Sequence, residues 1–293
     1  MFGPLFFLCI LIKLNFARIC QSGPLFWSTT GRGLLPPRPP LKPRGLHFYT
    51  FEGFSVAAKF SSTQRNKKLQ AALHEAKMLH QLKGLRGVVR MFFCVRDTDY
   101  VAVFTEHLKI DLEGGLGDFQ RLSWKRRLSL LIDPTRVLKS MHARGYVHGD
   151  LKPPNLMVAA DGRSLKLIDF DCSVRFGGRV RGYTQIYAAP EIYARDARAW
   201  PSQDAWGWTL TIVDLLLPGL RVKLKTVGWQ GSKKVFGPRH VKVVKSALRQ
   251  ASTLHALPLE KIIGRWLKLK PSDRPLMASI ERGLLHLLRA AGG

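Results

Sequence analysis

Acidic residues are scarce in this chain. It holds 20 Asp+Glu against 47 Lys+Arg, which gives a formal net charge of +27. A surface of this kind attracts polyanions, namely nucleic acid, anionic lipid or acidic protein segments. A basic surface that serves only solubility is the plain alternative. The first 51 residues contain no acidic residue. Residues 215–259 also contain no acidic residue, although they contain nine Lys+Arg.

Cysteine is also scarce, and the four that occur are Cys9, Cys20, Cys94 and Cys172. They form no Cys-x-x-Cys pair and have no histidine at metal-ligand spacing, so the sequence signals neither a zinc site nor a disulfide framework. We therefore expect a reducing compartment, the cytoplasm or the nucleus. For Cys172 we expect a buried, inert thiol rather than a reactive one.

Long apolar runs are missing as well. The longest one near the start, residues 1–12, is broken by Lys13 and is shorter than the roughly 20 apolar residues that span a bilayer. It fits the apolar core of a signal peptide, an organelle transit segment or an ill-defined start of the reading frame, and the sequence does not separate the three. Five prolines between Pro36 and Pro43 then predict an extended linker. We expect residues 1–44 to be a leader and linker, and membrane contact only through this leader.

The remaining sequence predicts a β-rich first half. Aromatic and β-branched residues on both sides of Gly53 predict two strands within residues 45–60. Apolar spacing predicts a helix over residues 69–82. Short strand-like runs follow at residues 88–95 and 100–106. This part reads as a small β-sheet unit with one helix.

The second half is mainly helical by pattern. Ser123 is placed to cap a helix, and Pro134 is expected to kink that helix or break it in two. Asp161-Gly162 predicts a hairpin between residues 156–158 and 165–168. Further helices are predicted over residues 201–217, 241–251, 259–267 and 278–288. The fold class is therefore α+β, with a small β-rich unit followed by a larger helical one.

Two motifs carry the chemistry. Residues 147–155 read Val-His-Gly-Asp-Leu-Lys-Pro-Pro-Asn, and residues 167–171 read Leu-Ile-Asp-Phe-Asp. The pair resembles the catalytic loop and the metal-binding loop of eukaryotic-type protein kinases. The resemblance implies that Asp150 handles the proton of the substrate hydroxyl and that Lys152 neutralises the transferring phosphoryl group. It also implies that Asn155 and Asp169 hold Mg²⁺.

Earlier residues extend the resemblance in the family's order. Lys59, in Val-Ala-Ala-Lys, is similar to the lysine that holds the ATP phosphates, and Glu75 is similar to its carboxylate partner. Thr105 and Glu106 end an apolar strand that resembles the hinge beside the adenine. The resemblance thus implies a bilobal kinase domain over residues 45–290. Its N-lobe would cover about residues 45–106 and its C-lobe about residues 110–290.

Later residues match structural positions of the family. The resemblance implies that Glu191, in Ala-Pro-Glu, pairs with Arg274, and that Asp204 holds the backbone of the catalytic loop. Thr184 and Tyr187 stand where the family places residues that dock a protein substrate. Lys152 favours the serine/threonine branch over the tyrosine branch.

Two positions depart from the family pattern, and one of its motifs is missing. Gly149 replaces an arginine that clasps a phosphorylated loop, so we expect loop phosphorylation not to be the main switch. Asp171 replaces a glycine, and Asp tolerates fewer backbone conformations. Between residues 45 and 59 no Gly-x-Gly-x-x-Gly occurs, and the fragment Gly31-Arg-Gly33 lies beyond the proline-rich stretch.

These observations predict ATP- and Mg²⁺-dependent phosphoryl transfer to Ser/Thr of a protein substrate, acidic in one reading. The alternative is an impaired pseudokinase that acts as a scaffold through its basic C-lobe. Two further readings are a small-molecule kinase and a basic binding protein without nucleotide. The basic segment 221–249 is either a solvated face or a surface for acidic protein or nucleic acid. The sequence gives no oligomeric state.

Overall fold

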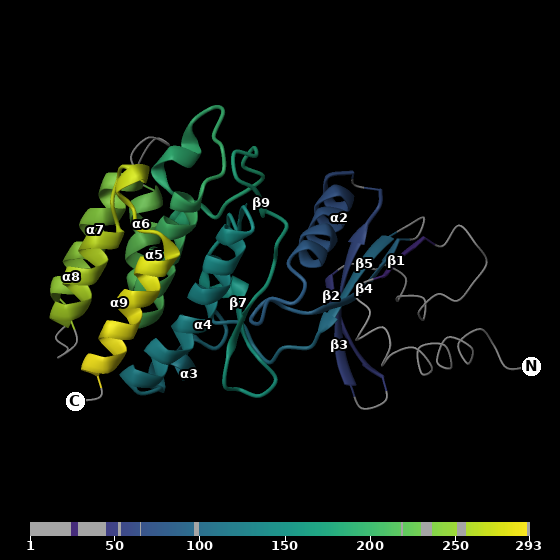
Figure 1. Ribbon diagram of the computed structural model, residues 1–293, viewed down its shortest axis with the longest axis horizontal. Coiled ribbons are helices and arrows are strands. Elements are labelled where there is room, and N and C mark those ends of the chain that lie inside the picture. The colour runs from purple at the N-terminus through teal and green to yellow at the C-terminus, as the bar shows by residue number, and fades with distance from the viewer. Residues whose placement is uncertain are drawn as a thin grey trace, which may run out of the picture. The chain divides into compact units, whose positions relative to one another are not determined.

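The computed structural model describes residues 25–28, 45–51, 54–64, 66–96, 100–217, 219–229, 236–250 and 256–291. The chain divides into two compact units (Figure 1). The first comprises Met1–Gly84 and Val88–Leu108, and the second comprises Leu85–Gly87 and Lys109–Gly293. Apart from one short strand, the expected leader and linker lie outside the described residues, and so does the fragment Gly31-Arg-Gly33.

The first unit contains a five-stranded sheet in the order β1-β4-β5-β3-β2. Its strands are β1 Leu25–Ser28, β2 Gly45–Phe51, β3 Phe54–Ser62, β4 Met91–Arg96 and β5 Tyr100–Glu106. The strand β1 pairs parallel with β4, and the other neighbours are antiparallel. The sequence predicts β2 to β5 but not β1.

The hairpin of β2 and β3 places Lys59 in the sheet. Phe51 pairs with Phe54, so two residues separate the strands, as the pattern around Gly53 predicts. Lys59 pairs with Leu46 on one side and with Val103 of β5 on the other. Among the described strands none pairs with the outer edge of β2, which therefore ends the sheet.

A buried cluster and one helix pack on this sheet. Alternate residues of β3 and β5, such as Ala58 and Phe104, join a buried aromatic cluster on one face. The helix α2, Asn66–Gln81, packs against β3, β4 and β5 of the sheet. Its buried residues include Ala72, Glu75 and Leu79, which recur at helical spacing. The position of Glu75 thus follows from the apolar stripe around it.

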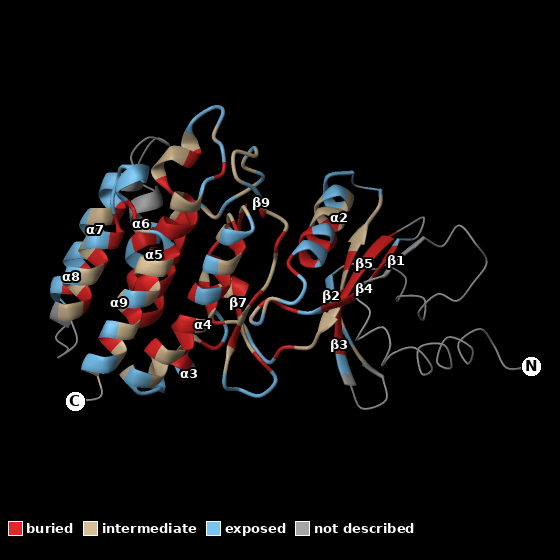
Figure 2. Cartoon of the chain, in the orientation of Figure 1, coloured by how far each residue is buried: buried red, intermediate tan, exposed pale blue. Residues whose placement is uncertain are grey.

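The second unit is built on helices, as the sequence predicts. They are α3 Leu116–Arg121, α4 Trp124–Ala143, α5 Pro201–Leu216, α6 Leu220–Trp229, α7 Phe236–Gln250, α8 Ala256–Trp266 and α9 Met277–Ala290. Every residue of α5 from Gln203 to Leu216 is buried, including Trp206 and Trp208. A helix that is buried on all sides is the centre of its unit, and Figure 2 shows α5 red along most of its length. The short helices α3 and α6 are not predicted by the sequence.

The helix α4 begins as predicted, because Ser123 Oγ accepts a hydrogen bond from Arg126 N (3.3 Å). It continues through Pro134 as one helix, so the expected break does not occur. Next to the proline, Thr135 Oγ1 donates to Leu131 O (2.8 Å) and accepts from Trp208 Nε1 (2.8 Å). These bonds and the packing of α4 against α9 hold the helix together where a backbone donor is missing.

Among the described residues of the second unit there are also two small sheets and four short 3₁₀ helices. The sheets pair β6 Tyr146–Val147 with β9 Val174–Arg175, and β7 Leu156–Val158 with β8 Leu165–Leu167. The 3₁₀ helices are η1 Pro153–Asn155, η2 Gln185–Tyr187, η3 Pro190–Tyr193 and η4 Pro271–Asp273. The predicted hairpin is confirmed. In its turn Gly162 has φ +69°, and Asp161 Oδ1 accepts from Arg163 N (2.7 Å).

The α+β fold class predicted from the sequence is confirmed, with a small β-sheet unit and a larger helical unit. Within the part of the chain that the structure describes, every helix is too short or too polar to traverse a bilayer.

Candidate active site

In the first unit, Lys59 and Glu75 form an ion pair. Lys59 Nζ lies 2.9 Å from Glu75 Oε2, across 16 residues of sequence. The lysine side chain is 44% exposed and that of the glutamate 8%, so the glutamate is fixed in the packed face of α2 while part of the lysine side chain reaches solvent. The pair predicted from sequence spacing is therefore present, and it orients a cation that can bind phosphate.

Thr105 and Glu106 lie at the end of β5. Thr105 pairs with Ala57 of β3, and Glu106 pairs with Val56. Glu106 also exchanges two bonds with Arg90: Arg90 N donates to Oε1 (2.7 Å), and Glu106 N donates to Arg90 O (2.9 Å). The carboxylate of Glu106 is thus engaged with backbone, so its role in the expected hinge would be carried by main-chain groups rather than by its charge.

In the second unit, one buried carboxylate fixes the loop after β6. Asp204, near the start of α5, accepts from His148 N (2.8 Å), Gly149 N (2.9 Å) and His142 Nε2 (2.8 Å). Burial raises the pKa of Asp204, but the hydrogen bonds and the positive character of these partners outweigh it, and the pKa lies below its ordinary value. The sequence-based expectation that Asp204 holds the loop's backbone agrees with this geometry.

Held by that loop, Asp150 is at the centre of a small polar network. Lys152 Nζ donates to Asp150 Oδ2 (2.5 Å) and to Thr184 Oγ1 (2.9 Å). The backbone N–H of Thr184 donates to Asp150 Oδ1 (2.7 Å). Asp150 is only 8% exposed. Each carboxylate oxygen keeps a second lone pair, so Asp150 can accept a hydrogen bond from a further hydroxyl group.

Asn155 and Asp169 supply oxygens suited to a hard cation. Asn155 Nδ2 donates to Asp150 O (2.8 Å), which leaves the amide oxygen as the group with ligand chemistry. Ile168 N donates to Asn155 O (3.1 Å), so the segment before Asp169 is tied to that of Asn155. Asp169 has φ +62°, and among the described residues no other non-glycine residue has a positive φ. An amide and a carboxylate oxygen fit Mg²⁺, which takes few protein ligands.

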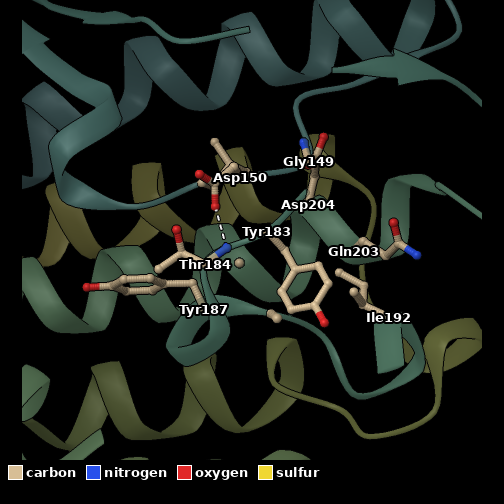
Figure 3. A pocket seen from close by; sticks show the side chains of 11 residues that line it. Gly149, Asp150, Tyr183, Thr184, Tyr187, Ile192, Gln203 and Asp204 are labelled. Atoms are coloured by element: carbon tan, nitrogen blue, oxygen red, sulfur yellow. Dashed lines mark hydrogen bonds between the residues drawn. The ribbon is translucent and has the colours of Figure 1, made fainter. Parts of the chain in front are cut away.

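A small, shallow pocket lies beside Asp150 (Figure 3). Its wall combines backbone at Gly149 and Gly207 with the side chains of Tyr183, Tyr187 and Ile192. Figure 3 shows the bond between Asp150 and the backbone of Thr184 at this pocket. The carboxylate therefore borders a pocket whose wall combines polar groups with aromatic and apolar side chains.

The structure gives a packing reason for one departure from the kinase pattern. Gly149 has φ +85°, and a Cβ there would lie 2.8 Å from Cys172 O. Asp171, the second departure, has no positive φ, so its backbone conformation does not require glycine. Arg181 Nε donates to Asp171 O (3.1 Å) and links this loop to the segment before Thr184.

Two ion-pair systems brace the site. Arg274 donates to both oxygens of Glu191, at 2.6 and 2.8 Å, as the sequence predicts. The second system is not predicted: Tyr187 Oη donates to Asp214 Oδ2 (2.6 Å), and Arg221 Nε donates to the same oxygen (3.1 Å). Burial, followed by the charge of Asp214, raises the pKa of Tyr187. Asp214 is an acidic residue within an otherwise apolar stretch of helix. A buried carboxylate of this kind needs a partner, and the sequence could have indicated one on that ground.

Comparisons with known proteins agree with this geometry. Residues 50–283 match the family described as protein kinase domain. The chain is 29% identical over 142 residues to probable serine/threonine-protein kinase gdt8 of Dictyostelium discoideum, covering 44% of this chain and 10% of that protein. It is 30% identical over 163 residues to serine/threonine-protein kinase KDX1 of Saccharomyces cerevisiae, covering 49% and 36%. Calcium-dependent protein kinase 5 of Oryza sativa subsp. japonica is 33% identical over 144 residues, covering 43% and 25%. The matches thus span less than half of each of these relatives.

Proposed function

The chain belongs to the protein kinase family, and we propose that it transfers the γ-phosphoryl group of ATP to serine or threonine hydroxyls of protein substrates. The single observation that carries the proposal is the fixed carboxylate of Asp150, held by Lys152 at 2.5 Å and by the backbone of Thr184 at 2.7 Å. Such a group can orient an attacking hydroxyl and accept its proton.

Each neighbouring residue has a distinct task in this proposal. Lys152 bridges Asp150 and Thr184, so its ammonium group is placed to offset phosphoryl charge next to the attacking oxygen. Lys59, oriented by Glu75, would bind the other phosphates of ATP. Asn155 and Asp169 would hold Mg²⁺, which supplies charge neutralisation to the triphosphate when bound.

The preference for serine and threonine rests on Lys152 and Thr184. Their hydrogen bond, 2.9 Å long, lies directly against the carboxylate of Asp150. In this proposal the hydroxyl of a serine or threonine, which sits on a short side chain, approaches the carboxylate of Asp150. The backbone of the substrate then lies beside the pocket of Tyr183 and Tyr187. The family relatives named as serine/threonine kinases support the same choice. We place the reaction in the cytoplasm or the nucleus.

A second candidate is a pseudokinase scaffold. One observation favours it: the family's glycine-rich loop precedes the strand of Lys59, and no Gly-x-Gly-x-x-Gly occurs between residues 45 and 59. Backbone amides of such a loop position the phosphate that is transferred, and their loss slows transfer. The presence of Lys59, Glu75, Asp150, Lys152, Asn155 and Asp169 favours the active enzyme.

The decisive experiment incubates the full chain with labelled Mg·ATP and two general substrates, one basic and one acidic protein. We expect label on serine or threonine, and a fall of at least about a hundredfold in Asp150→Asn. Asp118→Asn is the matched control, because Asp118 is exposed and pairs only at the surface with Arg121; its activity should be unchanged. A folded protein that is stabilised by Mg·ATP but transfers no label would establish the pseudokinase instead.

A further inference from the structure

A second pocket lies in the helical unit between α7 and α8. It offers about 90 Å³ of space, and its walls are mostly apolar. The residues that line it are Val241, Val244, Lys245, Leu248, Glu260, Ile263, Gly264 and Leu267. Val244, Leu248 and Ile263 are buried beneath it. None of these residues takes part in the network around Asp150, so the proposed phosphoryl transfer leaves the pocket unexplained.

The two helices run antiparallel along this pocket. Arg249, at the end of α7, lies 3.9 Å from Glu260, near the start of α8. Val241 and Leu267, at the opposite ends, both line the pocket. Figure 1 shows α7 and α8 as neighbouring helices, and the two pack together. The pocket is therefore a groove between two aligned helices rather than an isolated hole.

Basic residues border this groove on both sides. They follow directly after lining positions, at Lys242, Lys245 and Arg249 on α7 and at Lys261, Arg265 and Lys268 on or just after α8. In an antiparallel pair of helices, a residue that comes one position after a residue facing the partner helix points to one side of the pair. This side is the same for both helices. All six are exposed. Figure 2 shows exposed residues along α7 and α8. The single acidic lining residue, Glu260, already pairs with Arg249.

From this arrangement we propose that the α7–α8 groove is a docking site for an acidic amphipathic segment of a protein partner. Such a segment would insert an apolar side chain over Leu248, Gly264 and Leu267, and its flanking carboxylates would meet the basic borders. An apolar anchor surrounded by complementary charge is a common form of peptide recognition. The proposal does not depend on phosphoryl transfer, because it concerns binding alone.

Charge excludes two other occupants. The first 51 residues of the chain contain no acidic residue and cannot neutralise the basic borders. A second copy of this chain, with its net charge of +27, is disfavoured as the occupant of this groove because the basic borders would face another basic surface. Nucleic acid would satisfy the charges, but the lining residues include no aromatic side chain on which a base could stack. An acidic protein segment uses both the apolar groove and the charges around it.

The test uses the full chain and a labelled synthetic helical peptide, with leucines at i, i+4 and i+7 and glutamates beside them. A second peptide has serine in place of each leucine. We expect the leucine peptide to bind at least about tenfold more tightly, as followed by fluorescence anisotropy. Equal affinities of the two peptides would show that binding depends only on non-specific charge attraction and would contradict the proposal. Absence of saturable binding up to about 1 mM peptide would also overturn the proposal.

Gly264 offers a variant that fills the groove. A Cβ at this position meets no atom within 4 Å, so the side chain of Gly264→Leu can start without a clash and extend into the groove. We expect it to weaken the leucine peptide at least about tenfold while the circular dichroism spectrum stays the same. Unchanged affinity in the folded variant would contradict the proposal. Duplex DNA and anionic vesicles are tested in the same way. If one of them binds in place of the leucine peptide, and Gly264→Leu weakens that binding at least about tenfold, the groove takes a different class of partner and the proposal is overturned.

A charge variant tests the borders independently of the groove. Lys242→Glu/Lys261→Glu reverses one exposed charge on each helix, at positions that do not line the pocket, and should weaken the leucine peptide at least about tenfold. The matched control, Lys67→Glu/Lys68→Glu, makes the same charge change at exposed positions of α2 and should leave the affinity within about twofold. Equal losses in both variants would show a response to net charge alone. The Asp150→Asn protein should bind the peptide as well as the unchanged chain does.

Discussion

Gly149 packs directly against the backbone of Cys172: a Cβ on residue 149 would stand 2.8 Å from the carbonyl oxygen of Cys172. Because the contact is to backbone and Gly149 has φ +85°, any side chain there strains the loop that carries Asp150. Arginine, the residue usual in the family, is subject to the same two constraints. In this chain the glycine is therefore part of the loop's packing.

The first prediction concerns this glycine. Gly149→Ala should lower the free energy of unfolding by roughly 1–3 kcal/mol, as strained positions do. Gly264→Ala is the matched control, because it lies in a helix with open space at its Cβ and should raise stability by about 1 kcal/mol. Urea unfolding of both variants measures the difference. A neutral Gly149→Ala would show that the loop can move away from Cys172.

The second prediction concerns Arg274, whose side chain is fully buried against Glu191. Its guanidinium also donates to the backbone of Lys268, Leu269 and Ser202. Arg274→Ala should therefore lower the free energy of unfolding by about 3–5 kcal/mol. Arg121→Ala removes an exposed ion pair to Asp118 and should change it by less than about 1 kcal/mol. Similar losses in the two variants would contradict the assignment of Arg274 as a buried brace.

The third prediction concerns pH and Asp204. Its folded-state pKa is below its ordinary value, so its contribution to stability is complete above the ordinary value and is lost as the pH falls through the folded-state value. Unfolding free energies measured between pH 6 and 3 should therefore decline below about pH 4. In Asp204→Asn that component should be missing, and the variant should be less stable at pH 6. A parallel decline in both proteins would assign the acid sensitivity to other carboxylates.

The fourth prediction concerns activation by phosphorylation. Ser173 is fully buried and its hydroxyl donates to His148 O (2.9 Å), while Thr184 Oγ1 accepts from Lys152. Ser173→Glu should therefore destabilise the loop. Thr184→Glu places a second carboxylate beside Asp150 and should lower phosphoryl transfer at least about tenfold. Thr184→Ser keeps the hydroxyl and should retain most activity. A large gain of phosphoryl-transfer activity in either glutamate variant would contradict this prediction and would indicate that phosphorylation of the loop activates the protein.

The fifth prediction concerns thiol reactivity. Burial, followed by the negative charge of Asp171, raises the pKa of Cys172 far above its ordinary value. Burial, with the charge of Glu75, raises the pKa of Cys94 to about 12. Both thiols should react with iodoacetamide at pH 8 at least about tenfold more slowly than a free cysteine, because the thiolate is the reactive form. Peptide mapping by mass spectrometry measures each site, and fast labelling of Cys172 would show that the loop opens.

Features encoded by neighbouring residues could be predicted from the sequence. The hairpin at Asp161-Gly162 and the helix cap at Ser123 depend on contacts a few residues apart. The pair of Lys59 and Glu75 was predicted because the strand and the helix that carry them are each recognisable, and their spacing matches the kinase pattern. The predicted roles of these residues and of Asp150, Lys152, Asn155 and Asp169 stay predictions until activity is measured.

Features that depend on distant segments could not be predicted. The contact of Gly149 with Cys172 and the bond of Tyr187 to Asp214 appear only when separate loops and helices come together. The same holds for the groove of α7 and α8, since a basic residue next to an apolar one is unremarkable within a single helix. The break expected at Pro134 does not occur, and part of the support for α4 there comes from Trp208, which lies 73 residues after its partner Thr135.

The strand β2 has a consequence for how the protein behaves in concentrated solution. It forms the end of its sheet among the described strands, and its sequence, Gly-Leu-His-Phe-Tyr-Thr-Phe, contains neither lysine nor proline. Leu46 and Phe48 are more than half exposed. Proteins normally protect such borders with charge, proline or a covering segment, since an uncovered one invites strand-by-strand self-association. Charged replacements at Leu46 or Phe48 are therefore the natural means of keeping the protein monodisperse.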